Sequence, residues 1–154
     1  MRKMLLSFKP EVYEKIKSGK KIFEHRRNFP DEPIMAYMYV SAPVKAITGI
    51  VYLGKRHLLS DWHEGFKDDK DAVARIEKYQ ESYRYAMEID EFQETTEISL
   101  DDLRRDILGF YAPQMYIYLD GTKLLDYIES NIKYKHIVHK NEFQNIKSKE
   151  ICVH

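Results

Sequence analysis

Lys21, Glu24 and Arg26 stand close together in one charged stretch near the start of the chain, and these three residue types can do chemistry. A lysine partly removed from water loses solvation of its charged form, so its pKa falls and it can act as a base or nucleophile. A carboxylate such as Glu24 acts in the opposite direction and holds the ammonium charged. Arginine presents a planar fork of donors to phosphate or to a base edge. With the glutamate so near, the stretch favours ligand binding over catalysis.

The same stretch begins a predicted strand, which decides how its side chains are presented. Strand alternation places Glu24 and Arg26 on one face, with Phe23 and His25 on the other. Lys21 lies at the strand entry, where a turn can redirect it, so alternation does not assign its face. A structural alternative stays open at this point, because Glu24 and Arg26 can form an ion pair that braces the strand without any ligand.

A strand, a helix and a glycine precede this stretch and must position it. Residues 4–8 form a short apolar run with β character. Pro10 suits the first turn of a helix, where no backbone N–H is needed. Gly19 ends that helix, because glycine readily adopts the left-handed conformation. The predicted second strand then runs over residues 21–27.

The rest of the chain alternates short strands and helices. Periodicity predicts strands at residues 35–41, 46–53, 85–89 and 115–119, and helices at residues 70–82, after Ser99 and at 122–128. Gly49 indicates a bulge or a close backbone approach. Residues 55–71 are strongly polar and predict no regular element, although Trp62 among them is expected in the core, with a stacking platform as the alternative. Beyond residue 131 the chain predicts a final hairpin or a loosely held tail.

Five or six short strands with two to four peripheral helices predict an α+β fold, built as a small mixed sheet or a partly closed barrel. A chain of 154 residues is expected to form one domain with a sizeable core of its own. We expect this domain in residues 1–120. Residues 121–154 are then a C-terminal extension that packs on the domain or trails from it.

The charges and aromatic residues bound the possible ligands. The formal net charge is zero, which argues against a general binder of polyanions. Residues 1–30 hold nine Lys/Arg against three Glu, whereas residues 61–106 hold seven Lys/Arg against fifteen Asp/Glu. This asymmetry predicts either a local basic patch for phosphate or two faces that partly pair with each other. The 12 tyrosines suit half-buried strands, with a base-stacking surface as the sharper alternative.

Cysteine and histidine predict no metal site or cofactor. Cys152 is the single cysteine, so no disulfide can form within the chain and a cytoplasmic location is expected. We treat it as a tail residue. No apolar run approaches the roughly 20 residues needed to span a bilayer, so no membrane partner is expected. The pairs His57 and His63, and His136 and His139, lack companion cysteines and a recognised ligand spacing.

Four stretches, taken in order, resemble the ASCH domain family, a branch of the PUA-like β-barrel superfamily. They are Leu5-Leu6-Ser7-Phe8-Lys9-Pro10, the pattern of Gly19, Lys21, Glu24 and Arg26, Tyr39-Val40-Ser41-Ala42-Pro43-Val44, and Tyr85-Ala86-Met87-Glu88-Ile89 followed by Ala112-Pro113-Gln114. The resemblance covers residues 4–120 and implies a PUA-like β-barrel.

The resemblance also implies a function: RNA or a nucleotide-like ligand bound in a cleft beside the barrel. The expected ligand-binding residues are Lys9, Lys21, Glu24, Arg26 and Ser41. The serine can offer its hydroxyl or N–H to a ligand, or simply end a strand.

Two other functions stay open. One branch of the family is an amidohydrolase that removes the acyl group from acetylated cytidine with a lysine, a threonine and a glutamate. The lysine falls on Lys21 and the glutamate on Glu64, but the threonine position holds Glu24 here. The other alternative is a protein-interaction domain with an empty cleft.

Overall fold

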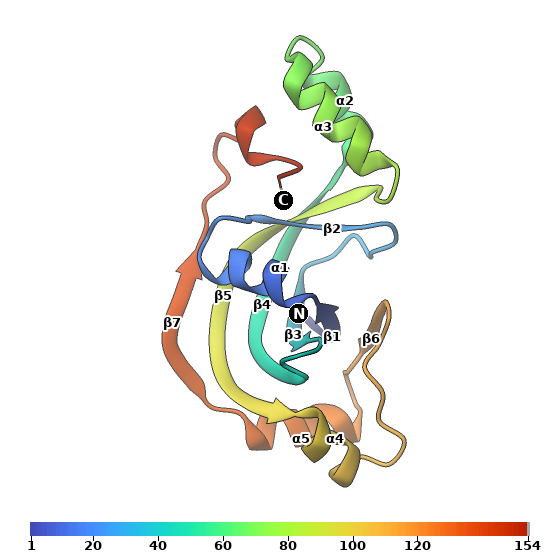
Figure 1. Cartoon of the computed structure of the whole chain (residues 1–154), viewed down its shortest axis with the longest axis vertical. Helices are drawn as coiled ribbons and strands as arrows, with labels where there is room; N and C mark the ends of the chain where they lie inside the picture. The colour runs from blue at the N-terminus through green and yellow to red at the C-terminus, as the bar shows by residue number, and fades with distance from the viewer. Residues whose placement is uncertain (154) are drawn as a thin grey trace.

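Residues 1–153 are described by the computed structural model, in which seven strands form one curled mixed sheet (Figure 1). The strands are β1 (Arg2–Phe8), β2 (Phe23–Arg26), β3 (Ile34–Val40), β4 (Ala46–Leu58), β5 (Tyr85–Ser99), β6 (Tyr116–Tyr118) and β7 (Tyr134–Lys140). Their order is β2-β5-β4-β3-β1-β6, and β7 pairs with β5. β1 and β3 run parallel, while the other pairs are antiparallel. The predicted α+β class is confirmed.

Helices lie in the hollow of the sheet and at its two ends. They are α1 (Pro10–Lys17), α2 (Leu59–Gly65), α3 (Lys70–Gln80), α4 (Leu100–Asp106) and α5 (Lys123–Asn131), with a 3₁₀ turn at Ser148–Glu150. In Figure 1, α1 crosses the hollow, α2 and α3 project at one end, and α4 and α5 lie at the other. The five α-helices of residues 1–153 exceed the two to four expected, because α2 was not predicted.

α1 closes the main core against the inner face of the sheet. Its Tyr13 and Ile16 are buried in one cluster with Met4, Leu6 and Phe8 of β1. Pro10 opens the helix, and Gly19 follows its end with φ +79°. The predicted unit of strand, helix, glycine and strand is therefore confirmed, although β2 itself covers only Phe23–Arg26.

The outer face of the sheet has its own core under α4 and α5. Leu103 of α4 and Leu125 and Ile128 of α5 pack with Leu5 and other outward-facing side chains of the sheet. Ser99 caps α4, because its hydroxyl accepts a hydrogen bond from the backbone N–H of Asp102 at 3.1 Å. The helix predicted after Ser99 is confirmed.

A third cluster holds β2 between helices α2 and α3 and the end of the chain. Phe23 packs edge-on against Trp62, at a ring-centroid distance of 5.0 Å. Ile76 and Tyr79 of α3 join them, and so do Ile151 and Cys152. The core assignment of Trp62 is confirmed. Cys152, expected as a tail residue, is instead buried.

Two strands are much longer than their apolar runs predicted. β4 continues to Leu58 and α2 begins at Leu59, inside the polar segment that predicted no element. β5 runs from Tyr85 to Ser99, well beyond the predicted residue 89. Polar residues concealed both extensions. Residues 54–58 of β4 are at least partly exposed, whereas β5 carries the buried polar residues Gln93, Glu94 and Thr95 between its buried Phe92 and Ile98. None of the helices in residues 1–153 is long and apolar enough to cross a membrane.

Candidate functional site

A pocket of about 440 Å³ opens at the free edge of β2. We call it the edge pocket. Its lining comes from β1, α1, β2, α3 and the segments that follow β1, α1 and α3: Ser7, Phe8, Lys9, Glu11, Val12, Lys15, Lys21, Glu24, His25, Arg26, Tyr79 and Tyr83. Four of the expected ligand-binding residues, Lys9, Lys21, Glu24 and Arg26, therefore line one pocket.

The pocket draws side chains from both faces of β2 because this strand lies at the end of the sheet order. Within residues 1–153, β2 pairs with β5 alone and leaves its other edge open. The predicted alternation holds, since Arg26 reaches toward β1 while His25 packs against Tyr79 of α3. A pocket that wraps the open edge therefore receives Glu24, His25 and Arg26 together.

Arg26 ties β2 to the two segments on the far side of the pocket. Its Nη2 donates to the backbone oxygen of Ser7 at 3.0 Å, and its Nη1 donates to that of Met115 at 3.4 Å. Its guanidinium also lies 5.5 Å from the ring centroid of Phe8. The planar fork thus bridges two carbonyl groups, which a lysine at this position could not do with the same geometry.

Glu24 is buried and is held by its neighbours along β2. Its Oε1 accepts the backbone N–H of His25 at 3.0 Å, and its Oε2 lies 3.5 Å from Nη2 of Arg26. The ion pair that was the structural alternative to a site is therefore present. The pair lies in the pocket wall, so these two residues can brace the strand and also contact a ligand.

Lys21 reaches into the pocket toward His25, with Nζ 3.3 Å from Nδ1 of the imidazole. Burial lowers the pKa of Lys21, and the nearby positive charge of Lys15 adds to that effect. The charge of Glu24 and the thiol of Cys152 raise the pKa, but less than burial lowers it. We expected the charge of Glu24 to hold the ammonium of Lys21 charged. Its effect on the pKa of Lys21 has the expected sign but is smaller than that of burial. Glu24 is itself engaged by Arg26 and a backbone N–H.

The rings of His25, Tyr79 and Tyr83 form an aromatic wall of the edge pocket. His25 lies edge-on to Tyr79 at a centroid distance of 4.7 Å, and Tyr79 lies 5.8 Å from Tyr83. Tyr83 is 36% exposed, so one large apolar ring meets solvent at the mouth. Sequence reasoning missed these residues and Lys15 as pocket residues. The helix predicted over residues 70–82 does not by itself mark a pocket: Tyr79 is buried on α3, and Tyr83 follows the end of that helix and is partly exposed.

Two predicted site residues lie outside the pocket. Ser41 follows β3, and its backbone N–H donates to the oxygen of Phe8 at 3.0 Å, as a residue that ends a strand would do. Glu64 lies on α2 with an exposed side chain and pairs with Lys67 at 3.3 Å. The structure therefore does not bring Glu64 together with Lys21.

Two of the histidines considered as possible metal ligands lie beside carboxylates. His57 contacts Glu88 at 2.7 Å, and His63 lies 3.6 Å from Glu77. In the part of the chain that the structure describes, no three His, Cys, Asp or Glu side chains gather as a metal site requires.

The sequence matches no protein-family model and no curated protein. Solved structures do match its fold. A crystal structure of ASCH from Zymomonas mobilis superposes with a TM-score of 0.64 at 22% identity, covering 86% of this chain and 96% of that chain. Crystal structures of two single-residue variants of that protein give TM-scores of 0.63 and 0.64, at 22% and 21% identity. They cover 84% and 86% of this chain, and 96% and 100% of their own. The protein therefore has the fold of an ASCH domain.

Proposed function

We propose that the protein binds RNA or a nucleotide-like ligand in the edge pocket. One observation carries the proposal: cationic side chains and a partly exposed aromatic wall line the same pocket. Its cations are Lys9, Lys15, Lys21 and Arg26, and its carboxylates are Glu11 and Glu24. The cations pair with phosphate groups, and a base stacks on the face of an aromatic ring. Single-stranded nucleic acid is bound through these two kinds of contact.

The lysines at the mouth are suited to phosphate. Lys9 is exposed and Lys15 is half-buried, and neither forms an ion pair with any other residue in 1–153. Their charge is therefore available to a ligand. Tyr83 offers its ring at the same mouth, where stacking on a base is worth about 1–3 kcal/mol.

The pocket is the size of a small-ligand site, since such sites span about 300–1,000 Å³ and this one measures about 440 Å³. It suits one nucleotide or a short single-stranded segment. The zero net charge of the whole chain agrees with a local contact to few phosphates rather than a long electrostatic footprint.

Fluorescence anisotropy with a labelled single-stranded oligoribonucleotide, titrated at several salt concentrations, tests the proposal. The affinity should fall with salt. Replacing both lysines (Lys9→Gln with Lys15→Gln) should reduce the slope of log affinity against log salt by about 1.4, since each single-strand phosphate contact contributes about 0.7. Tyr83→Ala should weaken binding with the slope unchanged.

Lys20→Gln is the matched control, because Lys20 is exposed beside Lys21 but lies outside the pocket lining. It should leave both affinity and slope close to those of the wild-type protein. Absence of binding to RNA and nucleotides at low salt would remove the proposal. So would a slope that the double lysine variant leaves unchanged.

The lowered pKa of Lys21 favours a second candidate, hydrolysis of an acylated nucleoside such as acetylated cytidine. A buried lysine beside an imidazole can supply a neutral amine as base or nucleophile. Acetate release from acetylated cytidine should then be lost in Lys21→Met. Glu64→Gln should leave the rate unchanged, because that carboxylate is exposed outside the pocket. Release that survives Lys21→Met excludes this mechanism.

A further inference from the structure

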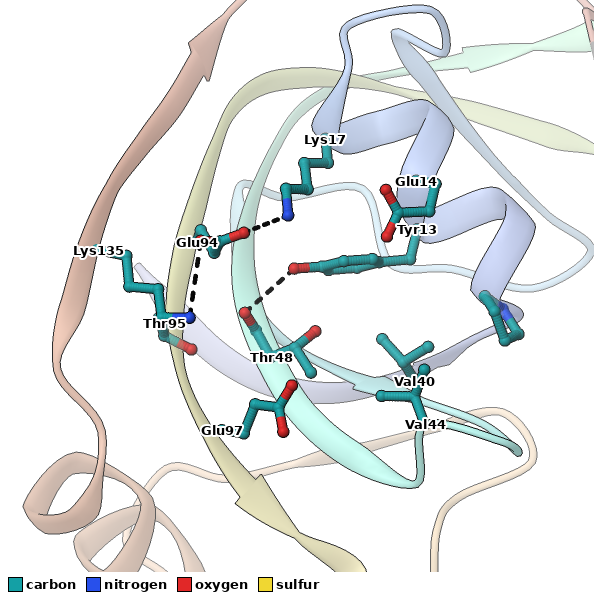
Figure 2. Close-up of a pocket in the computed structure, with 11 residues that line it drawn as sticks. Tyr13, Glu14, Lys17, Val40, Val44, Thr48, Glu94, Thr95, Glu97 and Lys135 are labelled. Atoms are coloured by element: carbon teal, nitrogen blue, oxygen red, sulfur yellow. Dashed lines mark hydrogen bonds and ion pairs between the residues drawn. The ribbon is translucent and has the colours of Figure 1, made fainter.

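A second pocket, of about 190 Å³, lies on the other side of α1 (Figure 2). We call it the bulge pocket. It is lined by Pro10, Tyr13, Glu14, Lys17, Val40, Val44, Thr48, Glu94, Thr95, Glu97 and Lys135. None of these residues lines the edge pocket, so α1 separates two distinct cavities.

Irregular strand pairing opens this pocket. Thr48 has no pairing partner on either neighbouring strand, since the register jumps from Ile47 to Gly49 against both β3 and β5. On β5 the same jump runs from Glu94 to Ile98. Bulges of this kind re-aim side chains and recur beside functional sites. The backbone oxygen of Thr48 accepts the hydroxyl of Tyr13 at 3.2 Å, which places α1 across the opening.

The hydroxyl of Thr48 has no use within the fold. Thr48 is only 6% exposed, and its Oγ1 finds no hydrogen-bond partner in the part of the chain that the structure describes. A covered hydroxyl without a partner is unfavourable, and a valine at this position of β4 would keep the shape without the hydroxyl. In Figure 2, Thr48 lies beneath Tyr13 at the centre of the pocket. The orphan hydroxyl points to a polar ligand group.

The charges around the pocket determine whether its ligand is a cation or an anion. Glu94 forms ion pairs with both lysines of the pocket, since Lys17 pairs with its Oε2 and Lys135 lies 3.9 Å from its Oε1. The bond to Glu94 raises the pKa of Lys17, which fixes its charge in this pair. Glu14 and Glu97 form no ion pair within residues 1–153 and lie on opposite sides of Tyr13 and Thr48 in Figure 2. Two carboxylates at the ends of the pocket therefore remain unpaired.

We propose that the bulge pocket binds a short aliphatic diamine. One ammonium group pairs with Glu14 and the other with Glu97, the chain between them packs on Val40 and Val44, and the hydroxyl of Thr48 accepts an N–H. This site is independent of the nucleic-acid function proposed for the edge pocket, because the two linings share no residue.

Three probes of one length test the charge requirement: 1,4-diaminobutane, 1,4-butanediol and succinate. Each is titrated into ¹⁵N-labelled full-length protein while the amide resonances are followed. The diamine alone should shift the amides of Thr48 and of residues 94–97 in a saturable manner. Equal shifts with the diol or with succinate overturn the proposal, and so does the absence of saturable shifts with the diamine.

Variants then assign the contacts. Glu97→Gln should weaken diamine binding about two- to fivefold, as expected for one exposed ion pair. Thr48→Val keeps the shape of the side chain and removes the hydroxyl. It should weaken diamine binding more than Glu97→Gln does, while the protein stays folded. Glu91→Gln, on the same strand outside the pocket, is the control and should not change affinity. Lys21→Met should also leave it unchanged, which separates this site from the edge pocket. Binding that neither Glu97→Gln nor Thr48→Val alters overturns the proposal.

Discussion

Lys21 shows how a residue type can be read from sequence while the effect of burial on that residue cannot. Its neighbours in sequence include Glu24, which raises its pKa, yet burial has the larger effect and lowers it. The residue types of the charged stretch predict a site, and Lys21, Glu24 and Arg26 line one pocket. Cys152, which acts on the same pKa, lies far away in sequence, so local reading could not provide the surroundings of Lys21.

The first prediction concerns the titration of Lys21. Its ¹³Cε resonance, assigned by its absence in Lys21→Arg, should titrate below the lysine reference of about 10.4, because burial disfavours the ammonium. Glu24→Gln should lower the Lys21 titration further, since the carboxylate raises it. A midpoint at or above the lysine reference would contradict the burial argument.

The same shift has a definite sign for stability. Between the folded and the unfolded pKa of Lys21, the unfolded chain binds more protons than the folded one. The free energy of unfolding should therefore rise with pH across that window, and below it the buried ammonium keeps a constant cost. Denaturant unfolding at several pH values in wild type and Lys21→Met measures the difference. The variant should lose the rise that belongs to Lys21.

Arg26 yields a stability prediction, because its fork joins β2 to two carbonyl groups. Arg26→Lys keeps the charge but loses the planar geometry, so it should reduce the free energy of unfolding by about 1–2 kcal/mol. Guanidinium unfolding followed by Trp62 fluorescence measures this, since Trp62 packs beside β2. Arg27→Lys on the exposed neighbour should stay within about 0.5 kcal/mol. Equal effects of the two variants would show that the fork is dispensable.

At the scale of elements, α1 is the wall shared by both pockets. Its residues alternate between them at helical spacing: Pro10, Tyr13, Glu14 and Lys17 face the bulge pocket, whereas Glu11, Val12 and Lys15 face the edge pocket. The helix was predictable from its proline, its apolar residues and its glycine. The pockets on its two sides were not predicted, because the strand bulge that opens one of them leaves only a faint trace in sequence.

Gly19 controls where β2 begins, and its replacement tests the turn. Its φ of +79° disfavours any residue with a Cβ, and an added Cβ would also collide with the ring of His139 on β7. The left-handed conformation alone costs about 1–2 kcal/mol. Gly19→Ala should therefore reduce the free energy of unfolding by more than this amount, measured by denaturant unfolding.

Gly121 provides the matched control. It has a similar φ of +74° with no atom within 4 Å of an added Cβ, so Gly121→Ala should show the conformational cost alone. Adding His139→Ala to Gly19→Ala should recover the steric part of the loss. A double variant with no recovery would mean that β7 shifts readily to make room for the added Cβ. The contact with His139 would then cost no free energy.

At the scale of the whole molecule, the order of the early elements and the charged stretch were predictable because local signals mark them. Pro10, Gly19 and the cap at Ser99 each act within a few residues. The long strands, the pairing of β7 with β5, and the exposed position of Glu64 depend on partners distant in sequence. The ASCH fold followed from the pattern of stretches, whereas which side chains meet in a pocket did not.

The chain end is a part of the core that composition concealed. Ile151 and Cys152 are buried against Phe23, Trp62 and Tyr79, behind the aromatic wall of the edge pocket. Burial raises the pKa of the Cys152 thiol to about 11, so the reactive thiolate is scarce near neutral pH. The residues after β7 therefore support the wall that Tyr79 forms.

The reactivity of Cys152 turns this arrangement into a prediction about cooperativity. Ile151→Ala should reduce the free energy of unfolding by about 2–5 kcal/mol, as for other buried isoleucines. If the chain end unfolds with the rest, Cys152 labelling by a thiol reagent should accelerate by the factor that this loss implies. Val153→Ala, at a position 37% exposed, should change neither quantity appreciably.

Labelling much faster than global unfolding allows would show instead that the chain end opens separately. In that case Tyr79 loses its support before the sheet unfolds, and ligand binding in the edge pocket should weaken in Ile151→Ala while circular dichroism still reports a folded protein.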